Sequence, residues 1–169
     1  AALWRVGVGS VYAGERLDIN GAFAGKGRAR GWNPNRPGHW DAKGEMTVSA
    51  IPGIGKNTVR LTSVSRDMHL AFGGQFPAKR GDKVAIQGLM RGRGAGLLGI
   101  YYYPAGGWRK KEFLVSDDWS EFAADLVVPE GAKTIRIVIG IPPGASTEFL
   151  DMSATLGEGD PAAAPAAGR

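Results

Sequence analysis

Short segments in which apolar and polar residues alternate constrain the fold of this chain more than any other feature of its sequence. From residue 83 to 91, Val84, Ile86 and Met90 fall on one side of the alternation and polar residues on the other. The period of two recurs over residues 134–139, where every second residue is isoleucine and Arg136 lies between two of them. Alternation of this kind is typical of a β-strand with one face in a core and one in solvent.

The same pattern predicts seven more strands, and turn residues separate nearly all of them. These strands are expected at residues 46–51, 57–64, 68–72, 97–103, 111–115, 121–128 and 148–156. Breaks such as Pro52-Gly53, Pro104 to Gly107 and Pro142-Pro143-Gly144 lie between the segments. No segment favours a long helix. The sequence therefore predicts an all-β protein with an antiparallel β-sandwich of the jelly-roll type.

A chain of 169 residues without cysteine fits one domain that is held together by its apolar core. The expected domain covers residues 1–157. Residues 158–169 are rich in Pro and Ala and are expected to form a linker or tail, which implies further domains of a parent polypeptide. No apolar run approaches the roughly 20 residues that span a bilayer, so no membrane span is expected.

The charges of the chain are divided along the sequence. Residues 26–111 contain 16 Lys and Arg against 4 Asp and Glu, whereas residues 112–160 contain 2 against 10. Such a division is found in proteins that bind an anionic partner and in proteins whose copies pair through opposite charges. Alternatively, strands from the two regions interleave in the sheets and the charges neutralise one another locally.

Aromatic residues and cations are concentrated in residues 95–111, which read AGLLGIYYYPAGGWRKK. If Ile100 faces the core, alternation turns Tyr102 inward and places Tyr101 and Tyr103 outward. Trp108 is expected in the turn that follows, with Arg109 beside it as a donor. Exposed rings cover the C–H faces of a sugar while cationic donors bind its hydroxyl groups, so this segment predicts glycan binding without catalysis.

Further candidate ligand-binding residues lie outside this segment. Trp40 follows a basic loop that is interrupted by Pro and Gly, where an aromatic side chain is less easily buried. Arg60, Gln87 and Arg91 occupy outward positions of expected strands and form either the floor of a polar groove or an ordinary solvated face. Trp32 and Trp119 are expected in the core, and His69 is expected to be a hydrogen-bonded scaffold residue.

Two separated regions resemble carbohydrate-binding modules of the family 4/9/22 type, in the galactose-binding-domain-like superfamily. The first is residues 17–23, with Asn20-Gly21 inside it and Gly31-Trp32 after it. The second runs from Trp119 through the Val128-Pro129 turn, residues 134–137 and the final segment 149–151. Residues 81–84 and 90–92 match between them, so the resemblance covers roughly residues 15–156.

The resemblance implies a jelly roll that holds a secreted or cell-surface carbohydrate-active protein, such as a glycoside hydrolase, on a polysaccharide. It also implies a structural calcium ion, for which Asp151 and Asp18 are the candidate ligands in this chain. The basic middle of the chain favours an acidic or sulfated glycan. Arg91, Arg109 and Lys110 would then meet the anion while Trp108 and Tyr101 stack.

Three other functions are compatible with parts of the sequence. One is a self-assembling extracellular structural or surface protein whose basic and acidic regions pair between copies. Another is a small polysaccharide lyase-like enzyme that uses His69, Tyr101 and Arg60. Nucleic-acid binding agrees with the pI near 9.7, but the chain contains no recognisable nucleic-acid module and its last third is acidic.

Overall fold

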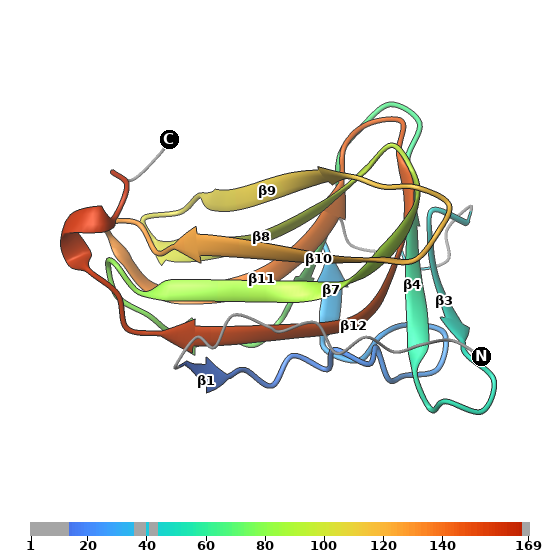
Figure 1. Ribbon diagram of the computed structural model, residues 1–169, viewed down its shortest axis with the longest axis horizontal. Helices are drawn as coiled ribbons and strands as arrows, with labels where there is room; N and C mark the ends of the chain where they lie inside the picture. Colours follow the sequence, from blue (N-terminus) through green and yellow to red (C-terminus); the bar gives the residue numbers. More distant parts are fainter. Residues whose placement is uncertain (1–13, 36–39, 41–43, 167–169) are drawn as a thin grey trace.

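The computed structural model of the chain describes residues 14–35, 40 and 44–166, and these fold almost entirely into strands (Figure 1). The strands are β1 (Glu15–Arg16), β2 (Trp32–Pro34), β3 (Met46–Ala50), β4 (Asn57–Thr62), β5 (Met68–Phe72), β6 (Phe76–Pro77), β7 (Lys83–Arg93), β8 (Ala95–Pro104), β9 (Trp108–Leu114), β10 (Ser120–Val127), β11 (Ala132–Ile141) and β12 (Ser146–Gly157). A short 3₁₀ turn, η2 (Pro161–Ala163), follows. None of the helical segments described has the length and hydropathy to cross a membrane.

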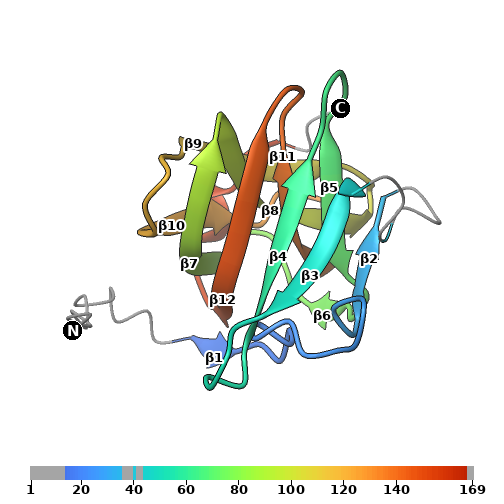
Figure 2. The ribbon, with the colours of Figure 1, turned by 90° about the vertical axis from the view of Figure 1, so that its right-hand side faces the viewer.

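The strands form two antiparallel sheets that pack face to face. Sheet A has the order β10-β7-β12-β4-β3, with β1 also paired to β12. Sheet B has the order β2-β5-β11-β8-β9, with β6 also paired to β11. In Figure 2, strands β7, β12, β4 and β3 run side by side, and strands of sheet B lie behind them. Because the chain passes repeatedly from one sheet to the other, the predicted jelly-roll sandwich is confirmed.

The core lies between the sheets and is built from the inward residues of the alternating patterns. Val84, Ile86 and Met90 of β7 are buried there, as are the inward isoleucines of β11. Tyr102 is 1% exposed, which confirms the inward orientation expected from Ile100. Trp32 is also in the core, but Trp119 is only half-buried and stands outside it, so the prediction for Trp119 was wrong.

Each of the nine predicted strands coincides with an observed strand, and all of their bounds agree within three residues. The largest difference is β9, which begins at Trp108 instead of residue 111. Trp108 therefore belongs to a strand and not to the preceding turn. Alternation does not predict β1, β2 and β6, because their two or three residues are too few for a period of two to be visible.

The basic and acidic regions of the chain interleave in sheet A. The basic strand β7 lies between β10 and β12, which both come from the acidic region. Ion pairs join the two regions: Arg91 to Glu148, Lys56 to Asp151, Arg80 to Glu130 and Lys79 to Glu158. Local neutralisation, one of the expected alternatives, is therefore observed in this sheet and in the turns beside it.

Residues 158–166 lie along one end of the sandwich, past the end of β12 (Figure 1). The Asp160 side chain caps η2 by accepting a hydrogen bond from the backbone N–H of Ala162 at 2.9 Å. Arg80 donates to the Pro161 carbonyl at 3.0 Å, and Arg109 donates to the Ala166 carbonyl at 2.8 Å. The predicted linker or tail is thus bound to the domain over its first residues, while residues 167–169 lie outside the described part.

Candidate functional site

Three aromatic side chains share the outer face of sheet B. Tyr101 and Tyr103 lie on β8 on the side opposite Tyr102, because successive residues of a strand point to opposite faces. Trp108 of β9 is the direct cross-strand partner of Tyr101, so the pairing places its side chain on the same face. All three are half-buried. We call Tyr101, Tyr103 and Trp108, with the polar residues around them, the aromatic face.

Two cations lie over rings of the aromatic face. The Lys110 ammonium is 4.5 Å from the centroid of the Trp108 ring, and the Arg136 guanidinium is 5.5 Å from the centroid of the Tyr103 ring. Arg136 is on β11, directly opposite Tyr101. Alternation places Arg136 outward but does not predict its part in the site, since only the pairing of β11 with β8 brings it to the tyrosines.

His69 also belongs to the aromatic face and is only 6% exposed. Its Nδ1 lies 2.8 Å from the hydroxyl of Tyr101, and its ring centroid lies 4.3 Å from that of Trp108. Its neighbour on β11 is Gly140, where an added Cβ would approach the His69 ring to 2.9 Å. Because Gly140 has no side chain, it leaves space for the His69 ring, which reaches Trp108 three strands away.

Burial changes the ionisation of two groups on this face. Desolvation lowers the pKa of His69; the nearby charge of Asp67 opposes this effect and that of Lys110 adds to it. Desolvation also raises the pKa of Tyr101 to about 12. Both side chains are therefore neutral near pH 7, and Tyr101 retains its proton.

Arg109 does not join the aromatic face, although it follows Trp108 in the sequence. Successive residues of β9 point to opposite sides, so Arg109 faces away from Trp108. Its guanidinium binds the carbonyl of Ala166, as described above. Trp40 packs against the core and is half-buried, and within the described residues no ring contact joins it to Tyr101 or Trp108.

Arg91, Gln87 and Arg60 lie on the outer face of sheet A, on the other side of the sandwich. The Arg91 guanidinium is 4.6 Å from the centroid of the Trp119 ring and 3.4 Å from a carboxylate oxygen of Glu148. Arg60 lines a shallow hollow of about 370 Å³ with Glu148 and Arg93. Of the eight predicted ligand-binding residues, three therefore lie on the outer face of sheet B and three on that of sheet A, while Arg109 and Trp40 belong to neither group. The eight do not form one site.

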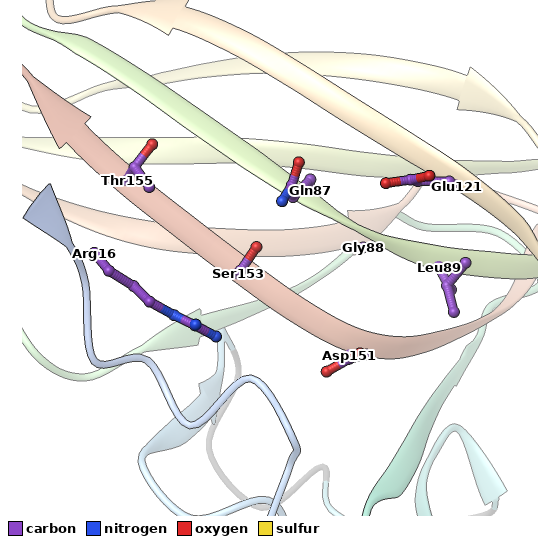
Figure 3. Close-up of a pocket in the computed structure, with 8 residues that line it drawn as sticks. All are labelled: Arg16, Gln87, Gly88, Leu89, Glu121, Asp151, Ser153 and Thr155. Atoms are coloured by element: carbon purple, nitrogen blue, oxygen red, sulfur yellow. The ribbon is translucent and has the colours of Figure 1, made fainter. Parts of the chain in front are cut away.

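Gln87 lines a second hollow on sheet A, of about 400 Å³ (Figure 3). Gln87, Ser153 and Thr155 rise from adjacent strands β7 and β12, and Arg16 extends from β1 toward Asp151. This hollow offers amide, hydroxyl and charged groups but no aromatic ring. A sugar bound there would have hydrogen bonds without a stacking surface.

Asp151 and Asp18, the candidate calcium ligands, line one hollow of about 490 Å³. Asp151 lies at an irregularity of β12, with φ of 54°, and its carboxylate is 2.9 Å from the ammonium of Lys56. Calcium prefers six to eight oxygen ligands. Within the described residues no three acidic or histidine side chains gather to hold a metal ion. Because the Lys56 ammonium is paired with the Asp151 carboxylate, this carboxylate does not suit a bound calcium ion.

Comparison with known proteins finds similarity in structure alone. No family model matches the chain, and no curated protein matches it in sequence. The CBM22-1 xylan-binding domain of Paenibacillus barcinonensis Xyn10C superposes with a TM-score of 0.57 at 16% identity, covering 88% of this chain and 98% of that domain. A family 4 carbohydrate-binding module superposes with a TM-score of 0.55 at 14% identity, covering 82% of this chain and 99% of that module. The chain has the fold of these carbohydrate-binding modules.

The same fold occurs inside a larger protein. The enzymatically active domain of bacteriophage CBA120 tailspike protein 4 superposes with a TM-score of 0.54 at 11% identity. That match covers 82% of this chain but only 20% of the tailspike chain. At these identities the comparisons show the fold, and the resemblance stated from the sequence is confirmed at that level.

Proposed function

We propose that the chain is a non-catalytic carbohydrate-binding module that binds a polysaccharide or oligosaccharide on its aromatic face. The observation that carries this proposal is that Tyr101, Tyr103 and Trp108 occupy one outer face of the sandwich, with Lys110 and Arg136 beside them. Rings stack on the C–H faces of sugars, and cationic donors bind hydroxyl or acidic groups.

An acidic glycan fits this face better than a neutral one. Among the described residues, Lys110 and Arg136 lie over the rings of Trp108 and Tyr103 and form no ion pair with a carboxylate, so their positive charge is available to a ligand. Lys110 is exposed, so a sugar that stacks on Trp108 would displace its ammonium toward the edge of the ring. There it would meet a carboxylate or sulfate group of the bound sugar.

Affinity electrophoresis through gels that contain a polysaccharide tests the proposal. Xylan, with and without glucuronate side groups, is a suitable first substrate because the family 22 neighbour is named as a xylan-binding domain. Pectic and sulfated polysaccharides follow as acidic alternatives. Trp108→Ala should abolish most of the retardation, because it removes the largest ring of the face.

Trp119→Ala is the matched control. Trp119 is also half-buried beside an arginine, but it lies next to sheet A. If Trp119→Ala removes retardation and Trp108→Ala does not, the binding face has been assigned to the wrong sheet. If the natural chain is retarded by none of the polysaccharides, the proposed function is wrong.

A lyase-like activity has one observation in its favour, namely the hydrogen bond between His69 and Tyr101. Against it, Arg60 lies on the other sheet, and the raised pKa of Tyr101 opposes the tyrosinate that would act as a base. Incubation with polygalacturonate, followed by ultraviolet absorbance, detects the unsaturated products of a lyase. We expect no increase.

The biological setting follows from the function. We infer that the module belongs to a secreted or cell-surface protein and holds a carbohydrate-active partner domain on its substrate. Binding to an exposed face of this kind is expected to be modest, because the sugar exchanges many hydrogen bonds with water for few with protein.

A further inference from the structure

His69 is held by groups from several elements around the aromatic face. Its Nδ1 lies 2.8 Å from the Tyr101 hydroxyl, and its Nε2 lies 3.1 Å from a carboxylate oxygen of Asp67. Within the described residues Nε2 makes no regular hydrogen bond, so its attraction to Asp67 is electrostatic. The backbone N–H of His69 donates to the side-chain oxygen of Asn35 at 3.4 Å.

These contacts determine which nitrogen carries the proton in the neutral ring. The negative charge of the Asp67 carboxylate, 3.1 Å from Nε2, attracts the positive end of an N–H and repels a nitrogen lone pair, so it favours a proton on Nε2. Nδ1 is then an acceptor, and the Tyr101 hydroxyl donates its proton to it. The lone pairs of the Tyr101 oxygen remain for a ligand, so in this state Tyr101 acts as an acceptor toward a bound sugar.

Protonation of His69 reverses this arrangement. With a proton on Nδ1, the histidine becomes the donor and the Tyr101 oxygen the acceptor, which frees the Tyr101 proton to point toward a ligand. The same step adds a positive charge 4.3 Å from the centroid of Trp108, on the face that already contains Lys110 and Arg136. Both changes favour a carboxylate or sulfate over a neutral hydroxyl group.

We propose that His69 is a positioning residue that sets the hydrogen-bonding direction of Tyr101 and makes the aromatic face bind acidic glycans more tightly in mild acid. This inference rests on the proposed function of that face. It deepens that function by naming the class of glycan and the condition that favours it.

The charges around His69 agree with a change in mild acid. Burial and Lys110 lower the pKa of His69, and Asp67 opposes them, so the ring is neutral at pH 7 and takes up a proton below the usual range of histidine. Arg136 faces the same site from β11, opposite Tyr101. An acidic ligand on this face raises the pKa of His69, and by linkage its affinity increases as the pH falls. Each unit by which the ligand raises that pKa increases the affinity up to about tenfold.

The first experiment needs no ligand. Nitrogen NMR of the two histidines, with His69→Gln to assign the signals, should show His69 with its proton on Nε2 at neutral pH and a titration below that of a free histidine. Asp67→Asn, at an exposed carboxylate, should move this titration to still lower pH. A proton on Nδ1 at neutral pH would overturn the proposed direction of the Tyr101 hydrogen bond.

The second experiment compares a xylo-oligosaccharide that carries one glucuronate with the unsubstituted oligosaccharide of equal length. Between neutral and mildly acidic pH, affinity for the glucuronate form should rise severalfold, while affinity for the neutral form stays level or falls. The rise should vanish in His69→Gln and shrink in Tyr101→Phe, which keeps the histidine charge but has no hydroxyl proton.

The outcomes separate this inference from the proposed function. Binding of either oligosaccharide without a gain in acid, or with the same gain in His69→Gln, contradicts the role of His69 and leaves the glycan-binding face intact. If neither oligosaccharide nor any polysaccharide in the gel series binds, the proposed function is wrong and the role of His69 fails with it. If His69→Gln does not fold, the rise in affinity in acid is measured in Tyr101→Phe and Asp67→Asn instead. An unchanged rise in both variants contradicts the role of His69.

Discussion

The two outer faces of the sandwich use their cations differently. On sheet A, Arg91 and Lys56 have carboxylate partners, Glu148 and Asp151. On sheet B, Lys110 and Arg136 lie over aromatic rings. An ion pair largely satisfies a charge within the protein, whereas a cation over a ring keeps a net charge that a ligand can share. A chain with a net positive charge can therefore have one outer face whose cations are paired and another whose cations are available to a ligand.

The difference arises from the way the acidic third of the chain is distributed between the sheets. Its strands β10 and β12 join sheet A, and both carry acidic residues that face or flank the basic strand β7. In sheet B this region contributes all of β11, which contains no acidic residue, and only the last three residues of β9, of which Glu112 is acidic. The strand order therefore brings most of the acidic residues to sheet A, where they pair with cations, and leaves Lys110 and Arg136 of sheet B beside aromatic rings.

The strongest test of the aromatic face compares two adjacent tyrosines of β8. Tyr102→Ala should destabilise the fold by about 3–5 kcal/mol, because it leaves a cavity in a core site that is 1% exposed. Tyr101→Ala should cost less, about 1–2 kcal/mol, through a lost hydrogen bond and ring contact. Denaturant unfolding measures both. Equal losses would mean that the face is part of the structural core and not a ligand surface.

A second test removes two positive charges from one face at a time. Lys110→Gln combined with Arg136→Gln should weaken retention on an acidic polysaccharide about tenfold, which corresponds to about 1.4 kcal/mol. Arg60→Gln combined with Arg91→Gln removes the same charge from sheet A and should change retention little, since Glu148 is close to both sites. Equal losses would show that the whole protein field, rather than the aromatic face, attracts the glycan.

The strands were predictable because alternation and turn residues mark them locally. The inward orientation of Tyr102 followed from its spacing to Ile100, and the structure confirms it. The composition of the site was not predictable in the same way, because it depends on which strands pair. Arg109 is adjacent to Trp108 in the sequence but faces away from it, whereas His69 is distant in the sequence and lies in contact with it.

Trp119 shows a further limit of sequence reasoning. Its place in the resemblance favoured a core residue, yet it is half-buried beneath Arg91 at the border of sheet A. A large aromatic residue before a strand can either close a core or support a surface cation. The choice depends on residues of another strand, here β7, which local patterns do not reveal.

A third, smaller effect concerns the bulge of β12. Lys56→Gln should lower the free energy of unfolding by about 0.2–1 kcal/mol, the range for a partly exposed ion pair. Millimolar calcium should not change the thermal midpoint of the natural chain, because Lys56 already occupies the Asp151 carboxylate. A clear rise with calcium that chelation reverses would instead support the calcium ion implied by the family resemblance.

The smallest expected effect is that of salt on the size of the particle. A protein whose basic and acidic regions pair between copies would dissociate as salt rises through the tenth-molar range, since screening then acts over about 10 Å. In sheet A these regions already neutralise each other within one chain, so light scattering should report a monomer at low and high salt. Retention on an acidic glycan should nevertheless weaken over the same range, because Lys110 and Arg136 act on an external charge. If the particle becomes smaller as salt is added, the basic and acidic regions pair between copies of the chain. The difference between the two faces would then reflect assembly and not glycan binding.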